Sequence, residues 1–236
     1  MSKLNLMIPI ILSTVRINSE PSFSIVFSLP GVFETDHFVA RQEELDEMHQ
    51  SLSNGSGRQA VTLHGLGGIG KTQLAIAYAK AHRDGYSAIL WLNIKDEVSV
   101  KQSYARIARR ILQEHPSAPQ LSGITDDTQL DTAVSAVKRW LGEAKNTRWL
   151  LVFDNYDTPK VPGNTGRSVV DIQQFLPDAH HGSVVVTTRS SKVHVGRRLQ
   201  VGKIKDVQDS LQILSNTSRR RGVMDGQSNL MEWKQR

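Results

Sequence analysis

The sequence contains no cysteine, and this absence excludes several kinds of chemistry. Without thiols the chain cannot form disulfide bonds, thiolate metal sites or thiol redox centres. This composition is typical of a reducing compartment, and we expect a cytoplasmic protein. The eight histidines are scattered, and His180 and His181 are sequence neighbours whose side chains we expect to point in different directions, so histidine does not predict a metal site.

Long apolar stretches and basic stripes are missing as well. The opening segment LNLMIPIILSTV, residues 4–15, is apolar for about ten positions, which is too short to span a bilayer. No small-residue cleavage site follows it, so we expect neither a signal peptide nor a membrane anchor. The net charge is +6, but part of the excess lies in the run 219–221, and no aromatic residues alternate with the basic ones. We therefore do not expect nucleic acid or a membrane as a partner.

Strand and helix patterns alternate along the middle of the chain. This alternation predicts an α/β fold whose mostly parallel sheet is covered on both faces and binds ligands at the carboxyl ends of its strands. Apolar runs predict strands at residues 60–65, 87–94, 149–153 and 184–188, with 199–204 as a candidate fifth strand. Helical spacing predicts helices at residues 41–52, 99–112 and 127–141, a shorter one around 169–176, and one after residue 70 with an apolar stripe of Leu74, Ala77, Tyr78 and Ala81.

The two ends of the chain show weaker patterns. Residues 1–36 contain three prolines and read as a poorly specified lead segment, with at most a short strand at FSIVFS, residues 23–28. We expect one domain over residues 37–203 and the beginning of a small helical region within residues 204–236.

A glycine-rich loop lies between the first predicted strand and the helix that follows it. Its sequence GLGGIGKT, residues 65–72, matches the pattern G-x-x-x-x-G-K-[ST] in the strand-to-helix context that this motif requires. Glycines allow successive backbone N–H groups to point at one anion, beside the positive end of the helix dipole. Lys71 then reaches the β and γ phosphates of a nucleotide, and the Thr72 hydroxyl can bind a bridging Mg²⁺.

Two further strands end in charged residues. Asp154 follows the run WLLVF, with Asp157 close behind it, and Arg189 follows the run VVVTT. Because the carboxyl ends of parallel strands meet at one edge of the sheet, we expect these side chains near the glycine loop. We predict that Asp154 holds Mg²⁺ opposite Thr72 and that Arg189 senses a γ-phosphate through charge-assisted hydrogen bonds.

These segments, in this order, resemble the NB-ARC nucleotide-binding domain of STAND-class P-loop NTPases. The family includes plant disease-resistance proteins, apoptosome-type adaptors and many fungal NOD-like receptors. The similar segments are HFVARQEELDEM before the P-loop, GLGGIGKTQLAIAYA at the Walker A motif, LLVFDNYD at Walker B, GSVVVTTRS at sensor 1 and LQVGKIKDVQDSLQILSNTSRR at the start of the helical ARC region. The resemblance covers residues 37–220 and implies a P-loop NTPase three-layer sandwich.

The resemblance also implies roles for individual residues. It places Val39 and Arg41 near the adenine and ribose, gives the phosphates to residues 68–72, and assigns Asp154 and Arg189 as above. The expected nucleotide-binding residues are Val39, Arg41, Gly65, Gly67, Gly68, Ile69, Gly70, Lys71, Thr72 and Gln73. Family members at rest hold ADP, and exchange for ATP opens them for oligomerisation, so we expect adenine nucleotides, Mg²⁺ and protein partners or self-association through flanking domains.

The sequence departs from the family pattern at several positions. Ala40 replaces the usual glycine, and Asn155 stands where many relatives carry a second acid that positions the attacking water. An amide cannot act as a base at neutral pH, which leaves Asp157 as the candidate substitute. The sequence lacks the Gly-x-Pro and Met-His-Asp motifs of the ARC region, and residues 221–236 resemble nothing in the family.

These observations favour a nucleotide-dependent molecular switch that prefers ADP and hydrolyses ATP slowly or not at all. One alternative is a turnover ATPase that uses Asp154, Asp157 and Arg189 as catalytic residues. A second is a degenerate, truncated module that binds nucleotide weakly. A small-molecule kinase is disfavoured because the sequence contains no arginine-rich lid. The preference for adenine depends on the resemblance alone, since no N-K-x-D-like guanine-binding motif is present to decide it.

Overall fold

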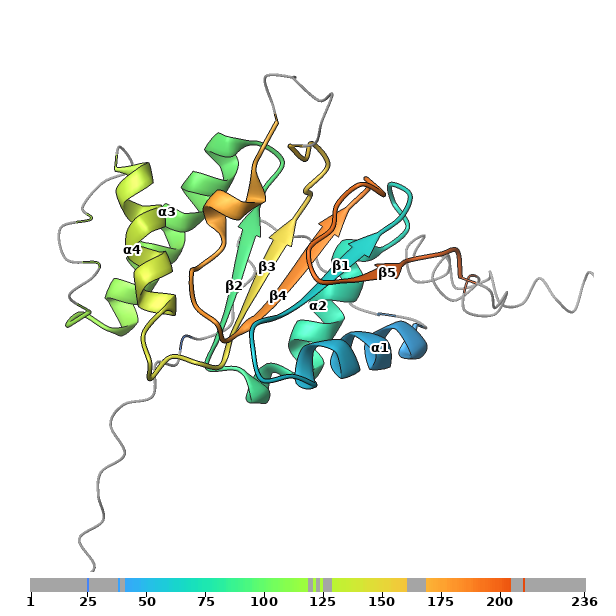
Figure 1. Ribbon diagram of the computed structural model, residues 1–236, viewed down its shortest axis with the longest axis horizontal. Helices are drawn as coiled ribbons and strands as arrows, with labels where there is room; N and C mark the ends of the chain where they lie inside the picture. The colour runs from blue at the N-terminus through green and yellow to red at the C-terminus, as the bar shows by residue number, and fades with distance from the viewer. Residues whose placement is uncertain are drawn as a thin grey trace, which may run out of the picture.

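The computed structural model describes residues 41–118, 129–160 and 169–204, together with five single residues: Ile25, Phe38, Leu121, Ile124 and Ser210. A five-stranded sheet forms the centre of the fold (Figure 1). All its strand pairs are parallel, and the strand order is β2-β3-β4-β1-β5. The strands are β1 (Gln59–His64), β2 (Ala88–Asn93), β3 (Trp149–Asp154), β4 (Ser183–Thr188) and β5 (Arg197–Gln200).

Helices cover both faces of the sheet. In Figure 1, α3 and α4 lie to the left of the sheet, and α1 and α2 lie to its lower right. The helices are α1 (Gln42–Ser53), α2 (Lys71–Ala81), α3 (Glu97–Glu114) and α4 (Leu130–Leu141), with short 3₁₀ turns η1 (Arg83–Gly85) and η3 (Ile172–Phe175). None of the described helices combines the length and apolar character needed to cross a bilayer.

The two layers of core follow from the alternation of side chains along each strand. Leu150 and Val152 of β3 pack with α1 and α2, whereas Leu151 and Phe153 pack with α3 and α4. All six residues of β3 and all six of β4 are buried. Strands covered on both faces read as continuous apolar runs, which is why the sequence pattern found them.

The structure confirms the predicted α/β fold and corrects several element boundaries. The predicted helix around residues 169–176 is only the four-residue turn η3. Its backbone is extended at Leu176, where the following Pro177 disfavours a helical conformation. α4 begins at Leu130 rather than residue 127, and α3 extends beyond the predicted range at both ends.

The fifth strand and the stripe of α2 also differ from the prediction. β5 comprises Arg197–Gln200 rather than residues 199–204, because its pairing with residues 61–64 of β1 begins at Arg197 and ends at Gln200. In α2, Ala81 is exposed and Ala77 partly exposed. The buried residues instead surround most of the helix, since α2 packs against both α1 and the sheet: they are Lys71, Leu74, Ala75, Ile76, Tyr78 and Ala79.

Parts of the sequence-based reading lie outside the described residues. Of the predicted strand at residues 23–28, only Ile25 is described: it is buried, and its backbone N–H donates to Ser87 O (2.8 Å). Val39, most of the lead segment and nearly all of the ARC-like region after residue 204 are likewise not described.

Candidate functional site

The glycine loop connects β1 to α2 at the carboxyl edge of the sheet. Gly68 and Gly70 have φ angles of 74° and 97°, a left-handed conformation that residues with a Cβ rarely adopt. Gly70 is also the N-cap of α2, and no side chain caps this helix. The first N–H groups of α2 are therefore available to an anion, as the glycine pattern predicted.

Lys71 lies folded over the loop that precedes it. Its Nζ donates to the backbone oxygens of Gly65 (2.9 Å) and Leu66 (2.8 Å). Burial lowers the pKa of the Lys71 ammonium, and Arg189 lowers it further, while Asp157 and Asp154 raise it. Within the described part of the chain, no carboxylate lies within ion-pair distance of this ammonium. A bound phosphate would supply the missing counter-charge.

Asp154 is the last residue of β3 and contacts two threonines of the site. Its Oδ1 accepts hydrogen bonds from the hydroxyls of Thr72 (2.8 Å) and Thr187 (2.6 Å). Only 4% of the residue is exposed, and burial raises the pKa of its carboxyl group against these hydrogen bonds. A hydroxyl and a carboxylate side by side are the oxygen ligands that Mg²⁺ prefers, so these residues fit the predicted metal.

Arg189 and Asp157 form an ion pair at the edge of the site. The Arg189 Nε and backbone N–H donate to the two carboxylate oxygens of Asp157, at 2.5 Å and 2.7 Å. The arginine side chain is 65% exposed and the aspartate side chain 21%. Arg189 therefore follows β4 at the predicted edge of the sheet. Its guanidinium already forms an ion pair with Asp157 in the free domain.

One cleft of about 480 Å³ lies among these groups, and Asp154 contacts two of its lining residues without lining it. The residues that line it are Gly67, Gly68, Gly70, Lys71, Thr72, Gln73, Asn155, Asp157, Thr187 and Arg189. The cleft therefore brings together most of the predicted phosphate-binding residues. Thr187 and Asn155 were not predicted as site residues. The two threonines at the end of the apolar run 184–186 are a weak indication of a site in the sequence. Thr187 reaches Asp154 only because β4 lies beside β3 in the sheet.

Comparison with known proteins identifies the family to which this arrangement belongs. The family model of the NB-ARC domain matches residues 41–221. The chain belongs to the NB-ARC family. It is a nucleotide-binding module of the P-loop NTPase type. A nucleotide-binding leucine-rich repeat (NLR)-like protein of Hyaloscypha variabilis is similar to this NB-ARC chain, with 26% identity over 213 residues. The alignment covers 84% of this chain and 20% of the relative, so the chain spans about one fifth of that protein's length.

One solved structure supports the P-loop NTPase fold of this NB-ARC domain. Cdc6p from Pyrobaculum aerophilum matches with a TM-score of 0.50 and 14% identity, covering 83% of this chain and 54% of that protein. The Aeropyrum pernix Orc1 protein, solved in complex with DNA, gives a TM-score of 0.44 and 20% identity over 78% of this chain and 50% of that one. At such identities the likeness to Cdc6p speaks for the fold alone.

Arg41 lies behind the P-loop of this NB-ARC domain rather than in the cleft. It is the N-cap residue of α1, with a left-handed φ of 77°. Its guanidinium donates to Ile69 O (2.8 Å), Gly202 O (3.0 Å) and Glu44 Oε1 (2.9 Å), and only 8% of the residue is exposed. Arg41 therefore ties α1, the P-loop and the chain after β5 together.

Two of the predicted P-loop residues also lie outside the cleft lining. The Ile69 side chain packs against the core between the sheet and α1/α2. A Cβ at Gly65 would come within 2.5 Å of Val201 O, so this glycine permits a close backbone approach behind the loop. Both residues support the loop from the side away from the cleft.

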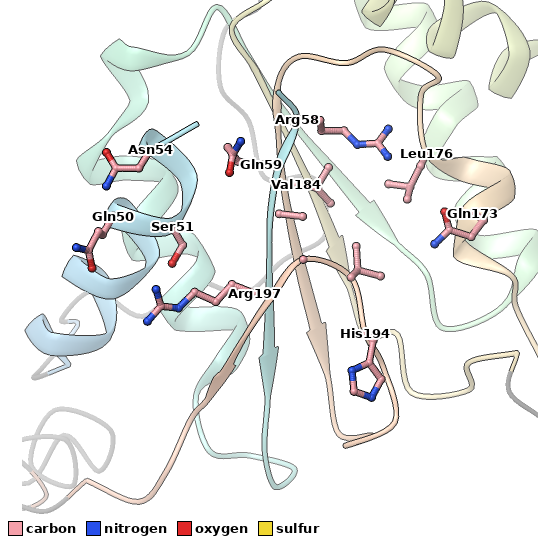
Figure 2. Close-up of a pocket in the computed structure, with 13 residues that line it drawn as sticks. Gln50, Ser51, Asn54, Arg58, Gln59, Gln173, Leu176, Val184, His194 and Arg197 are labelled. Carbon is pink, nitrogen blue, oxygen red and sulfur yellow. The ribbon is translucent and has the colours of Figure 1, made fainter. Parts of the chain in front are cut away.

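A second cavity of about 620 Å³ lies at the opposite edge of the NB-ARC sheet (Figure 2). It is lined by residues from α1, from the start of β1 and from the segment before β5, including Gln50, Arg58 and His194. Its position at the amino ends of the strands places it away from the P-loop. Although it is larger, it lacks the glycine loop and the helix N-terminus that bind phosphate.

Proposed function

We propose that this NB-ARC domain binds ADP and Mg-ATP in the cleft and acts as a nucleotide-dependent switch with slow or no hydrolysis. The observation that carries the proposal is the convergence of three groups at one edge of the sheet. The P-loop offers its N–H groups, Lys71 offers an ammonium without a carboxylate partner among the described residues, and Thr72 contacts Asp154 at 2.8 Å. Together they suit a polyphosphate and its divalent cation.

The Thr72 hydroxyl and the Asp154 carboxylate are the residues that would hold Mg²⁺. The cation would neutralise phosphate charge and offset the cost of a buried carboxylate, whose pKa burial raises in the free domain. Thr187 orients the same carboxylate oxygen from β4, so the metal-binding pair is positioned by two strands and one helix.

The acids of the site give little support to rapid hydrolysis. Asn155 presents an amide, and its Nδ2 donates to Asp154 Oδ2 (3.3 Å). Both oxygens of Asp157 accept hydrogen bonds from Arg189. A turnover ATPase needs a base beside the attacking water, and Asp157 would have to leave Arg189 to serve as one. Single-turnover hydrolysis by the wild type and the Asp157→Asn variant separates a switch from a turnover enzyme.

A switch needs a ligand that binds two conformations unequally. Lys71 and Arg189 both hold internal partners that a triphosphate would replace, namely two loop carbonyls and the Asp157 carboxylate. We infer that occupation of the cleft changes these contacts and passes the change to the segment after β5, which Arg41 links to the P-loop through Gly202. In a longer receptor-like protein this change would signal to flanking domains or to further copies of the chain.

Calorimetric titration of the purified chain with ADP and millimolar Mg²⁺ tests the proposal. We expect saturable binding that the Lys71→Ala variant weakens by about tenfold or more, because a charged hydrogen bond contributes about 1.5 to 3 kcal/mol. Lys145→Ala is the matched control, since Lys145 is exposed in the connection before β3, at the other edge of the sheet. Absence of binding by folded wild type, or equal affinities in the two variants, would exclude the proposed site.

A further inference from the structure

The position of Asp157 in the cleft is not explained by nucleotide binding alone. A carboxylate repels phosphate, yet Asp157 lines the same cleft as the P-loop. Its negative charge raises the pKa of the Lys71 ammonium, against the lowering by burial. The negative charge of Asp157 therefore acts at the place where Lys71 is expected to meet the terminal phosphates.

Asp157 also binds the cationic group that lies beside the P-loop. Its two oxygens hold the backbone N–H and the Nε of Arg189, so the arginine is bound at two points. The aliphatic part of the Arg189 side chain packs against Gly67 of the loop. A Cβ added at Gly67 would lie 3.3 Å from Arg189 Cδ. The arginine is thus beside the phosphate-binding loop while its charge is compensated by Asp157.

A diphosphate and a triphosphate differ in what they require of this pair. A diphosphate held by the P-loop N–H groups and Lys71 has no need of Arg189, so it can bind while the ion pair stays intact. A third phosphate that recruits Arg189 must break the contacts with Asp157 and leaves an uncompensated carboxylate beside the phosphates. The pair therefore opposes the third phosphate in two ways, by holding the cation and by like-charge repulsion.

We propose that Asp157 is a specificity-determining residue that makes the cleft prefer a nucleoside diphosphate over the corresponding triphosphate. The proposal deepens the proposed function and depends on it. It assigns to one side chain the preference that the switch needs in its resting state, and it places that side chain in the connection after β3, outside the P-loop.

The test compares ADP with a non-hydrolysable ATP analogue on the Asp157→Asn variant by calorimetry at constant free Mg²⁺. Asparagine keeps an oxygen that can accept from the Arg189 backbone N–H but removes the charge. We expect the dissociation constant of the triphosphate analogue to fall about tenfold, while that of ADP changes less than about threefold. The ratio of the two constants is the measured quantity.

Two further variants make the result decisive. Asp157→Ser removes the charge with a smaller side chain, and it should shift the ratio in the same direction. Asp84→Asn is the matched control, because Asp84 is a 95% exposed acid paired with Arg83 in η1, outside the cleft lining. Thermal melts should show all three variants folded, since the Arg189 side chain is 65% exposed and an ion pair with a solvated partner contributes little stability.

The possible outcomes separate this proposal from the function on which it depends. If wild type and variants bind ADP but the ratio stays constant, the role of Asp157 is wrong while the nucleotide site stands. If Asp157→Asn weakens the triphosphate, Asp157 assists the third phosphate instead of opposing it, and the proposal is again overturned. If folded wild type binds neither nucleotide, the proposed function itself is wrong.

Discussion

The buried carboxylate of Asp154 should destabilise the free domain, and this leads to a quantitative prediction. Only 4% of the residue is exposed, and burial raises the pKa of its carboxyl group despite two hydrogen bonds from threonine hydroxyls. Burial of a polar group that its hydrogen bonds do not fully compensate costs about 1 to 3 kcal/mol in mutational data. Asparagine is neutral and its Oδ1 can still accept from both threonines, whereas its Nδ2 cannot accept the 3.3 Å hydrogen bond that the exposed Asn155 Nδ2 donates to Asp154 Oδ2. We therefore expect Asp154→Asn to raise the free energy of unfolding at pH 7 by about 1 kcal/mol in the absence of nucleotide and metal.

The pH dependence of this difference has a definite sign. The folded-state pKa of Asp154 is higher than the unfolded value of 3.8, so the folded state retains its proton to higher pH. The wild type therefore loses this part of its stability as the pH rises from about 4 through the folded pKa. Below the unfolded pKa the Asp154 carboxyl is neutral in both the folded and the unfolded wild type. The free energies of unfolding of variant and wild type should therefore converge at low pH.

Urea unfolding at several pH values between 3.5 and 7 measures this difference. Asp96→Asn serves as the control with the opposite sign. Asp96 caps α3 and accepts a hydrogen bond from the Ser99 backbone N–H (2.7 Å), which lowers the pKa of its carboxyl group. Its negative charge therefore stabilises the fold above the unfolded pKa, and this stabilisation is lost as the pH falls.

The same variant should lose the contribution of Mg²⁺. With Mg-ADP present, we expect the wild type to gain stability and Asp154→Asn to gain much less, because the charged metal ligand is gone. If Asp154→Asn instead lowers the stability of the free domain at pH 7 by about 1 kcal/mol or more, the charge is a structural requirement and the reasoning from burial is refuted.

Two other predictions concern the backbone and the arginine behind the loop. Gly68→Ala should lower the free energy of unfolding by about 1 to 2 kcal/mol, because the φ of 74° is strained for alanine while no atom lies within 4 Å of the new Cβ. Gly182→Ala should lower it by about 3 kcal/mol or more, because this φ is also positive and the new Cβ would lie 2.3 Å from the Trp149 ring. Equal losses in denaturant titrations would contradict this comparison. Arg41→Lys should lower the free energy of unfolding by about 2 kcal/mol and weaken ADP binding, since an ammonium cannot reproduce the three hydrogen bonds of the guanidinium; unchanged stability and affinity in the same two assays would rule out its role behind the loop.

Much of the candidate site follows from local patterns in the sequence. The strand, glycine loop and helix around Lys71 are contiguous, and each conformation depends on nearby residues, so the motif predicts a phosphate-binding loop without tertiary information. Asp154 and Arg189 were predicted because each follows a continuous apolar run, and parallel strands place such positions at one edge of a sheet. The family resemblance drew on the same segments and was confirmed over residues 41–221.

Other features depend on which elements become neighbours, and local patterns do not encode this. Thr187 reaches Asp154 because β4 pairs with β3 and lies between β3 and β1. Arg41 holds Ile69 O and Gly202 O, partners 28 and 161 residues away along the chain. The partnership of Asp157 with Arg189 likewise joins the ends of two strands.

The sequence by itself therefore determined the chemical character of the site, namely a phosphate-binding loop with a cation, a hydroxyl and a carboxylate. The tertiary structure alone decided which charges pair in the free domain: Arg189 pairs with Asp157, while Lys71 donates to carbonyls of the loop. The physical reason is that backbone preference and hydrophobic periodicity act over a few residues, whereas charge pairing depends on distances set by the packing of the whole sheet.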